Sequence, residues 1–551
     1  MVQVDEVDLM DAVDLQWIHT SRGNLNGRRS FSTVKLHHYG PLAPLRGFLA
    51  SRVNLSWFPF SSMNQAQALH FDLQAAARQE MLENGFEPDF PPAAVQQMAQ
   101  ISATPPEVAP AQDVRDLRNL PWSSIDNDTS RDLDQIEVAE KLPDGKIKVL
   151  VGIADVDAFV GQNTPIDQHA AKETTTVYTG VRNFPMLPED LSTGASSLLP
   201  DADKLCIVIE FVVDGQGQLA SRDLYRAVVR NQAQLTYNAV GAWLENGAAA
   251  PPKVAASAEL QAQLKVQDQA AQALKNERYR HGALNIETAE VHPLVLNDKV
   301  VDLVKQQKNR ATDLIEDFMI AANGAVALSL EERKVASIRR VVKTPERWDR
   351  IVALAARQGG KLPAQPDSKA LNDFLQTRKA ADPDHFADVS LAVIKLMGPG
   401  EYVLERPGEP SPGHFGLAVQ NYTHSTAPNR RFADVVTQRL VKAALAGKSS
   451  PYSDDELSQV ARNCTERENA ARKVERAMSK RIAAVSMASR IGQVFDAIVT
   501  GAAEHGTFVR VLQPHVEGML VHAQGVDVGD RLRVKLISTD PYRGYIDFAR
   551  A

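Results

Sequence analysis

A run of acidic residues near residue 130 is the part of this sequence best suited to chemistry. Asp126, Asp128, Asp132 and Asp134 fall within nine residues. Asp126, Asp132 and Asp134 are separated by even numbers of residues, six and two, so an extended chain would direct them to the same side. Carboxylates this close repel each other unless a cation lies among them. Their oxygen atoms suit Mg²⁺, with Mn²⁺ as an alternative, and such ions often act on phosphate esters. An acidic surface loop is the simpler interpretation of this cluster taken alone.

A second polar segment lies far downstream. Residues 422–434 read Tyr-Thr-His-Ser-Thr-Ala-Pro-Asn-Arg-Arg-Phe-Ala-Asp, so that Pro428 precedes Arg430 and Arg431 at the start of a helical pattern. An arginine held rigidly near a helix start can grip a phosphate through its planar guanidinium group. Two ordinary surface arginines beside a loop would explain the segment if nothing else accompanied it.

The elements that must position these residues can be predicted from apolar periodicity. Strand patterns near glycine-containing turns cover residues 146–154 and 204–213. Helical patterns cover residues 313–333 and 433–445, and the capping box Ser-Asp-Asp-Glu at 453–456 opens a long charged helix that reaches residue 489. Strands followed by helices indicate an α+β domain.

The two ends of the chain differ in their predicted secondary structure. Five short strand patterns follow one another near the C-terminus, at 491–499, 506–511, 517–522, 529–536 and 544–548. Their number and spacing predict a small OB-type β-barrel. Near the N-terminus, helical patterns at 64–84 and 91–101 are joined by a turn, and a proline-rich linker spans 105–112. Residues 1–104 could form a helix-turn-helix-like nucleic-acid-binding module or an ordinary helical bundle.

Composition restricts the class of protein. A chain of 551 residues must form several domains, and its 44% hydrophobic and 23% charged content is that of a soluble globular protein. Two cysteines are too few for a disulfide framework or a cysteine zinc site. The acidic N-terminus differs from a secretory signal, and no apolar run is long enough for a membrane helix. We therefore expect a cytoplasmic protein without a membrane partner, monomeric and without an obligate protein partner.

The two polar segments together resemble the ribonuclease II (RNB) family of exoribonucleases. The resemblance rests on Ser-Ile-Asp…Asp-Leu-Asp at 124–134 and on Tyr-Thr-His-x-Thr-x-Pro-x-Arg-Arg-Phe-Ala-Asp at 422–434. It continues through Pro-Met-Leu-Pro at 185–188, Gly-Ala-Leu at 282–284 and residues 314–323, in the family's order. It implies a catalytic domain over residues 113–488 and an S1-type RNA-binding barrel over 489–551. The two oligonucleotide-binding barrels that usually precede the catalytic domain are not evident in residues 1–110.

The resemblance also implies roles at the catalytic centre. Asp126, Asp132 and Asp134 match aspartates that hold Mg²⁺ beside the scissile phosphate. Arg430 matches an arginine that neutralises charge on the pentacoordinate phosphorus. Gln135 stands where the family usually has a fourth aspartate, and its amide oxygen could still ligate the ion without adding charge. Metal affinity should therefore be lower unless Asp128 or Glu137 compensates.

Four further residues match positions that contact RNA. Tyr178 would position the last nucleotide and Glu475 the terminal ribose, while Tyr237 and Glu316 would contact RNA farther up the channel. Structural alternatives exist for each residue: the tyrosines could be aromatic residues at the edge of the core, and the glutamates could pair along their own helices.

Two more departures from the family pattern concern neighbouring positions. Ile286 replaces an aromatic residue that helps to sandwich the terminal bases, which should weaken stacking. Asn429 replaces the usual aliphatic residue before Arg430.

The leading hypothesis is a Mg²⁺-dependent 3′-to-5′ exoribonuclease that hydrolyses single-stranded RNA processively to nucleoside 5′-monophosphates. The alternative is a catalytically impaired RNB-family protein that binds RNA or regulates it, which Gln135 keeps open. A phosphatase of small phosphate esters could use the same metal ligands, but that activity would not explain the C-terminal barrel.

Overall fold

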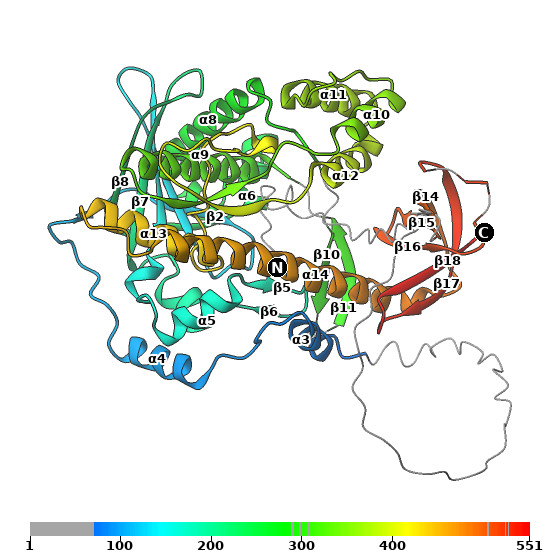
Figure 1. The fold of residues 1–551 in the computed structure, drawn as a ribbon, viewed down its shortest axis with the longest axis horizontal. Coiled ribbons are helices and arrows are strands. Elements are labelled where there is room, and N and C mark those ends of the chain that lie inside the picture. Colours follow the sequence, from blue (N-terminus) through cyan, green and yellow to red (C-terminus); the bar gives the residue numbers. More distant parts are fainter. Residues whose placement is uncertain are drawn as a thin grey trace, which may run out of the picture.

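The computed structural model of this protein describes residues 71–551, apart from 288–290, 297–298, 306–307, 504–505, 524 and 527. Figure 1 shows a sheet with its covering helices, a separate group of three helices, and a C-terminal barrel. One long helix, α14 (Asp454–Met487), runs from the sheet region to the barrel. None of the helices in the described ranges combines the length and apolar character needed to cross a membrane.

A seven-stranded mixed sheet forms the centre of the catalytic region. Its strand order is β1-β8-β7-β4-β3-β2-β9, with parallel pairing only between β1 and β8 and between β2 and β9. The predicted strands at 146–154 and 204–213 are confirmed as β4 and β7. The strands are β1 (Val114–Asp116), β2 (Ser123–Asp126), β3 (Gln135–Lys141), β4 (Ile147–Ala154), β7 (Asp203–Val213), β8 (Leu219–Arg230) and β9 (Ala233–Thr236).

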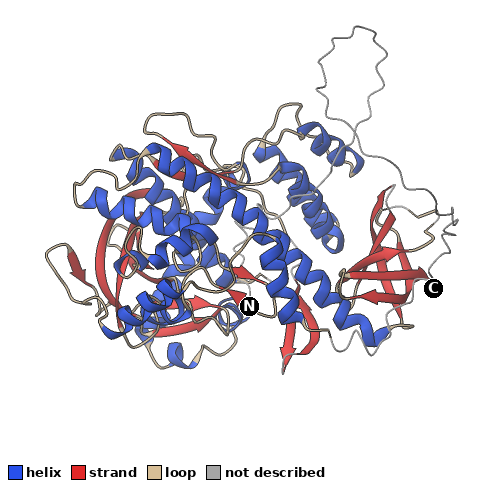
Figure 2. Cartoon of the chain, turned by 60° about the horizontal axis from the view of Figure 1, so that its bottom comes forward, coloured by secondary structure: helices blue, strands red, loops and turns tan. Residues whose placement is uncertain are grey.

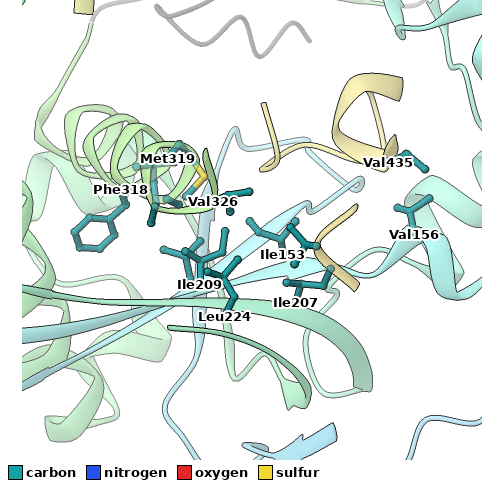
Figure 3. Packing of buried hydrophobic residues seen from close by; sticks show 14 of the residues in the cluster. Ile153, Val156, Ile207, Ile209, Leu224, Phe318, Met319, Val326 and Val435 are labelled. Carbon is teal, nitrogen blue, oxygen red and sulfur yellow. The ribbon is translucent and has the colours of Figure 1, made fainter. Parts of the chain in front are cut away.

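The main hydrophobic core lies between one face of this sheet and the helices that cover it. Figure 3 shows Met319 and Val326 of α9 close to Ile209 and Leu224 of the sheet. The helix predicted at 313–333 is confirmed as α9, which begins at a capping box formed by the Asn309 and Thr312 side chains. The covering elements are α5 (Pro165–Glu173), α6 (Tyr237–Asn246), α7 (Pro252–Ala255), α8 (Ala258–Arg280), α9 (Arg310–Glu332) and α13 (Phe432–Leu445).

The C-terminal residues form the predicted barrel. Its five strands close in the order β14-β15-β16-β18-β17, and Figure 2 shows the barrel standing at one end of the molecule. The predicted capping box of α14 is present, because Ser453 Oγ accepts from the Glu456 N–H and Glu456 Oε2 accepts from the Ser453 N–H. At its other end, Ala484 and Met487 of α14 are part of the barrel's core. The strands are β14 (Val494–Ala503), β15 (Gly506–Val511), β16 (Val516–Leu520), β17 (Arg531–Asp540) and β18 (Tyr545–Arg550).

The two N-terminal helices that were predicted are present as α3 (Leu73–Glu83) and α4 (Pro92–Ala103). Each is anchored on the catalytic region, because Met81 of α3 packs with Val474 of α14, and Met98 of α4 lies in the main core beside α5. The structure thus joins these helices to the catalytic domain. The helix-turn-helix-like arrangement and the boundary at residue 104 stay predictions, and residues 1–70 lie outside the described residues.

Residues 348–397, for which no element was predicted, form the separate helical group. Its core includes Trp348, Ile351 and Phe386, and Arg510 of the barrel forms an ion pair with Asp388 at 2.6 Å. The group consists of α10 (Trp348–Arg357), α11 (Ser368–Ala381) and α12 (Phe386–Met397). Three two-stranded sheets complete the fold: β5 (Val177–Tyr178) with β6 (Asn183–Phe184), β10 (Val291–Leu296) with β11 (Lys299–Lys305), and β12 (Ser337–Val341) with β13 (Glu401–Glu405).

Candidate active site

The aspartate run is not one extended segment, so the even spacing is not what brings its members together. Asp126 is the last residue of β2, and residues 127–134 form a turn and loop that lead back into the antiparallel strand β3. The reversal places Asp134 at the start of β3, beside the end of β2. The relative positions of these carboxylates therefore depend on a chain reversal and not on strand alternation.

Asp126 is held inside the protein by its own loop. It is 1% exposed, and its Oδ1 accepts hydrogen bonds from the Asn127 N–H at 2.6 Å and from Ser130 Oγ at 2.9 Å. Burial raises the pKa of Asp126 to about 7, the two hydrogen bonds oppose this, and the negative charge of Asp132 raises it further. Asp132 is therefore close enough for the two charges to interact.

Asp134 joins this loop to the downstream polar segment. Its Oδ1 accepts from the backbone N–H of Asn429 at 2.8 Å, across 295 residues of sequence, and its Oδ2 lies 3.7 Å from Nε of Arg430. Burial raises the pKa of Asp134 well above its usual range, and the charge of Arg430 opposes the rise. Asp134 and Arg430, which are 296 residues apart in the sequence, are thus neighbours in the fold.

Tyr178 and Glu475 also lie at this site. The Tyr178 hydroxyl is 3.5 Å from Asp132 Oδ2, the outer limit of a hydrogen bond, and the Tyr178 N–H donates to Glu475 Oε1 at 3.0 Å. Burial raises the pKa of the Tyr178 hydroxyl well above its usual range. The charges that act on that hydroxyl belong to Asp132, Arg430, Asp134 and Asp126. The charges of all four predicted catalytic residues therefore act on the Tyr178 hydroxyl.

Tyr237 lies in the core, as its structural alternative has it, whereas Glu316 pairs with residues outside its own helix. Tyr237, the first residue of α6, is 8% exposed and belongs to the main hydrophobic core. Glu316 on α9 forms ion pairs with Lys308 at 2.6 Å and with Arg278 at 3.8 Å. Contact of either residue with RNA stays a prediction.

The departures from the family pattern have distinct structural outcomes. Ile286 is buried in the core of the helical group, which leaves it no exposed face on which a base could stack. Asn429 holds Asp134 through its backbone N–H, and its side-chain Oδ1 accepts from Ser196 Oγ at 2.6 Å. Asp128 is exposed and accepts from Asn238 Nδ2 at 3.0 Å, whereas Glu137 is buried.

Comparison with known proteins agrees with this geometry. The RNB domain profile matches residues 114–447, which is more than half of the chain. The chain belongs to the RNB family. An RNase II-type exonuclease C-terminal S1 domain matches residues 493–551, which coincide with the barrel. The resemblance noted from the sequence is therefore confirmed, as is the α+β fold with a C-terminal OB-type barrel.

Several RNB-family relatives are named ribonuclease R. That of Escherichia coli is 31% identical over 458 residues, which cover 80% of this chain and 54% of the relative. The ribonuclease R of Aquifex aeolicus is 28% identical over 481 residues, which cover 82% of this chain and 67% of the relative. The chain thus spans about half the length of the Escherichia coli relative.

Solved structures with the same fold include a protein named RNase R and a protein described as a pseudonuclease. The apo form of Mycoplasma genitalium RNase R matches with a TM-score of 0.78 at 22% identity, covering 87% of this chain and 78% of that one. Yeast Ssd1, described as a pseudonuclease, matches with a TM-score of 0.63 at 15% identity, covering 85% and 57%. At these identities the likeness shows the RNB fold alone.

A divalent cation fits the donor atoms of this RNB site. Within the described ranges, no three His, Cys, Asp or Glu side chains lie close enough together to hold an ion by themselves. Mg²⁺ commonly binds through one or two carboxylates and completes its coordination with water and substrate phosphate. The oxygen donors of Asp126, Asp132 and Asp134 suit such an ion.

Backbone groups that sequence reasoning did not identify complete the site. The Thr176 N–H donates to the Arg430 carbonyl at 3.0 Å, which ties the segment before Tyr178 to the loop that carries the arginine. The Asn429 N–H bonds Asp134 in the same way. Every residue type except proline has a backbone N–H, so the identity of a residue does not show that its backbone donates such a bond. These contacts therefore could not have been predicted from the sequence.

Proposed function

We propose that this protein is a Mg²⁺-dependent 3′-to-5′ exoribonuclease that hydrolyses single-stranded RNA processively to nucleoside 5′-monophosphates, acting as a monomer in the cytoplasm. The observation that carries the proposal is the meeting of Asp132, Asp134 and Arg430 around the Tyr178 hydroxyl. Buried carboxylates beside an arginine suit the charge changes of phosphodiester hydrolysis.

The chain's own residues divide the chemistry among them. Asp126, Asp132 and Asp134 would hold the ion, which supplies polarisation of the phosphate and a water molecule of lowered pKa. Arg430, oriented by Asp134, would stabilise the negative charge that develops on the phosphate oxygens. The hydrogen bonds around Asp126 and Asp134 keep both carboxylates in place before substrate arrives.

RNA is favoured over a small phosphate ester by the barrel and by Tyr178. Phe508 of β15 and Met519 of β16 are cross-strand partners, 43% and 36% exposed, and they form an apolar patch on which unpaired bases could stack. Tyr178 and Glu475 would position the terminal nucleotide beside the aspartates, and Tyr237 and Glu316 would act farther along the path. We propose the 3′-to-5′ direction, the processivity and the products by analogy with the RNB family.

The second candidate is an RNA-binding protein with an impaired catalytic centre. Gln135, which stands where the family usually has a fourth aspartate, favours it. The retention of three aspartates, Arg430 and Tyr178 in one place favours hydrolysis.

A direct assay separates the two. The purified protein should shorten 5′-labelled single-stranded RNA with Mg²⁺ or Mn²⁺ and release mononucleotides. Asp134→Asn should abolish degradation and preserve RNA binding, since its amide oxygen can still accept from the Asn429 N–H. Asp128→Asn, the same change on an exposed residue of the same loop, serves as the control. Intact RNA with every divalent ion tested, together with firm RNA binding, would establish the RNA-binding protein instead.

A further inference from the structure

Asn323 is a polar residue on the core-facing side of α9. It is 2% exposed, and it follows Met319 by four positions and precedes Val326 by three, so the three side chains share one face of the helix. Met319 and Val326 both belong to the main hydrophobic core (Figure 3). An amide buried on such a face is costly unless its polar groups form hydrogen bonds. The hydrogen-bond partners of Asn323 therefore indicate the role of the amide.

The Asn323 side chain forms four hydrogen bonds, and all four go to one segment, residues 422–426. Its Oδ1 accepts from the Ser425 N–H and from Ser425 Oγ, both at 2.8 Å. Its Nδ2 donates to the Tyr422 hydroxyl and to Thr426 Oγ1, both at 3.3 Å. A side-chain amide has two donor hydrogens and two acceptor lone pairs, so this capacity is used in full.

The segment 422–426 depends on such bonds because it is buried and has no regular secondary structure. Each of its residues is 5% exposed or less. Near its beginning, Thr423 Oγ1 donates to the Ile338 carbonyl of β12 at 2.7 Å. Near its end, Asn323 holds both the backbone and the side chain of Ser425. Two neighbouring elements, β12 and α9, thus fasten the segment at different points.

The end of this segment leads directly into the loop of Arg430. Ala427, the first residue after the segment, donates its N–H to Asp434 Oδ1 at 2.8 Å. The Ala427 carbonyl accepts from the Arg430 N–H at 3.2 Å. Asn323 therefore fixes the chain immediately before the turn that places Arg430 beside Asp134.

We propose that Asn323 is a positioning residue that holds the loop of Arg430 against Asp134. This role rests on the transition-state function proposed for Arg430 and deepens it. Asn323 acts through the backbone that runs from residue 425 to residue 430, and its own hydrogen bonds go to the segment and not to a substrate. A displacement of about 1 Å in the catalytic geometry can lower turnover about 10²-fold, so a rigid attachment at this point should matter for the reaction.

Hydrogen exchange of backbone amides, measured by mass spectrometry on the full chain, tests the attachment independently of activity. Asn323→Leu keeps the approximate size of the side chain and removes its polar groups, and exchange in residues 427–434 should become about tenfold faster. Asn323→Asp should stay closer to the native rate, because all four partners have a hydrogen that they can donate to a carboxylate.

Asn372→Leu is the matched control for these variants. Asn372 is 4% exposed on α11, and its Oδ1 accepts from the Asn285 N–H at 2.9 Å. It is therefore another buried asparagine whose side chain bonds a backbone group, but it lies in the separate helical group. Its substitution should leave exchange in residues 427–434 unchanged.

Kinetics on a short labelled RNA connect the attachment with Arg430. Asn323→Leu should lower kcat about 10–100-fold and change RNA affinity little. In the Arg430→Ala background the same substitution should lower kcat less than about threefold, because the group that it positions is absent. A merely structural defect would lower kcat by the same factor in both backgrounds, and that result would overturn the inference.

The outcomes separate this inference from the proposed function. Exchange at the native rate in a folded Asn323→Leu protein would overturn the inference and leave RNA degradation by the native chain unaffected. A native chain that does not degrade RNA would remove the proposed function, and exchange would still decide whether Asn323 holds the loop. If Asn323→Leu does not fold, the double variant Tyr422→Phe/Thr426→Val removes both acceptors of Asn323 Nδ2 instead. Unchanged exchange and kcat in that double variant would overturn the inference.

Discussion

The carboxylate of Glu475 accepts a hydrogen bond from the backbone N–H of Tyr178 at 3.0 Å, across 297 residues of sequence. This bond ties α14 to the short strand β5, and it leaves the Tyr178 hydroxyl facing Asp132 at 3.5 Å. Glu475 therefore positions the tyrosine through its main chain, whatever contact its carboxylate also makes with a substrate ribose.

That bond predicts different results for two substitutions at Glu475. Glu475→Gln keeps an oxygen acceptor and should leave the KM for a short RNA within about twofold. Glu475→Ala should raise KM several-fold, because the lost hydrogen bond contributes about 1 kcal/mol or more. Steady-state kinetics on a short labelled RNA measures both. Equal damage by the two variants would mean that the charge of Glu475 matters and not its acceptor. Combined with Tyr178→Phe, Glu475→Ala should cost less than the sum of the single effects.

Arg430 should contribute mainly to turnover. Arg430→Ala removes a fixed positive charge beside Asp134, and kcat should fall by about 10²–10³ while RNA affinity changes less than about tenfold. Arg431 is unsuitable as a control because it pairs with Asp434 in the core. Arg131→Ala, on an exposed residue of the aspartate loop, provides the comparison. Equal losses of kcat and affinity in Arg430→Ala would contradict a role in the transition state.

Glu173 gives the protein a pH-dependent stability outside the site. Burial raises its pKa from 4.5 to about 7, although both of its oxygens accept from the Glu87 N–H at 3.1 Å. The folded state thus binds more protons than the unfolded state between these values, and the free energy of unfolding falls as pH rises from about 4.5 to 7.

Glu173→Gln should remove this fall in the free energy of unfolding with rising pH. The variant should gain stability relative to the native protein on going from pH 5 to pH 8, by up to about 3 kcal/mol. Urea unfolding at several pH values measures the difference. A difference that stays constant with pH would show that Glu173 titrates normally in the folded protein.

Gly518 is required by the packing of the barrel. A Cβ at this position would lie 2.5 Å from the Ile546 carbonyl oxygen and 2.6 Å from the Phe548 ring. Gly518→Ala should therefore destabilise the barrel by about 1–3 kcal/mol, seen as faster hydrogen exchange in β16 and β18. Gly215→Ala, where a Cβ meets nothing within 4 Å, is the matched control. Normal exchange in Gly518→Ala would indicate that the strands can move apart without cost.

Predictability from the sequence differed between local and long-range features. The capping box at Ser453, the strands β4 and β7 and the five barrel strands were predictable because they depend on residue patterns within a few positions. The helical group at 348–397 was not predicted, although its helices are equally local. The core position of Tyr237 was not predicted as such, because a match by sequence position gives no burial.

The sequence by itself indicated the barrel strands, two strands of the main sheet and several helices, together with the RNB family and the chemical types of the site residues. Only the tertiary structure decided that Asp134 bonds the Asn429 backbone and that Glu475 holds Tyr178. Local patterns cannot specify such contacts, because they depend on how segments hundreds of residues apart pack together. Both bonds also use a backbone N–H, a group that every residue type except proline shares.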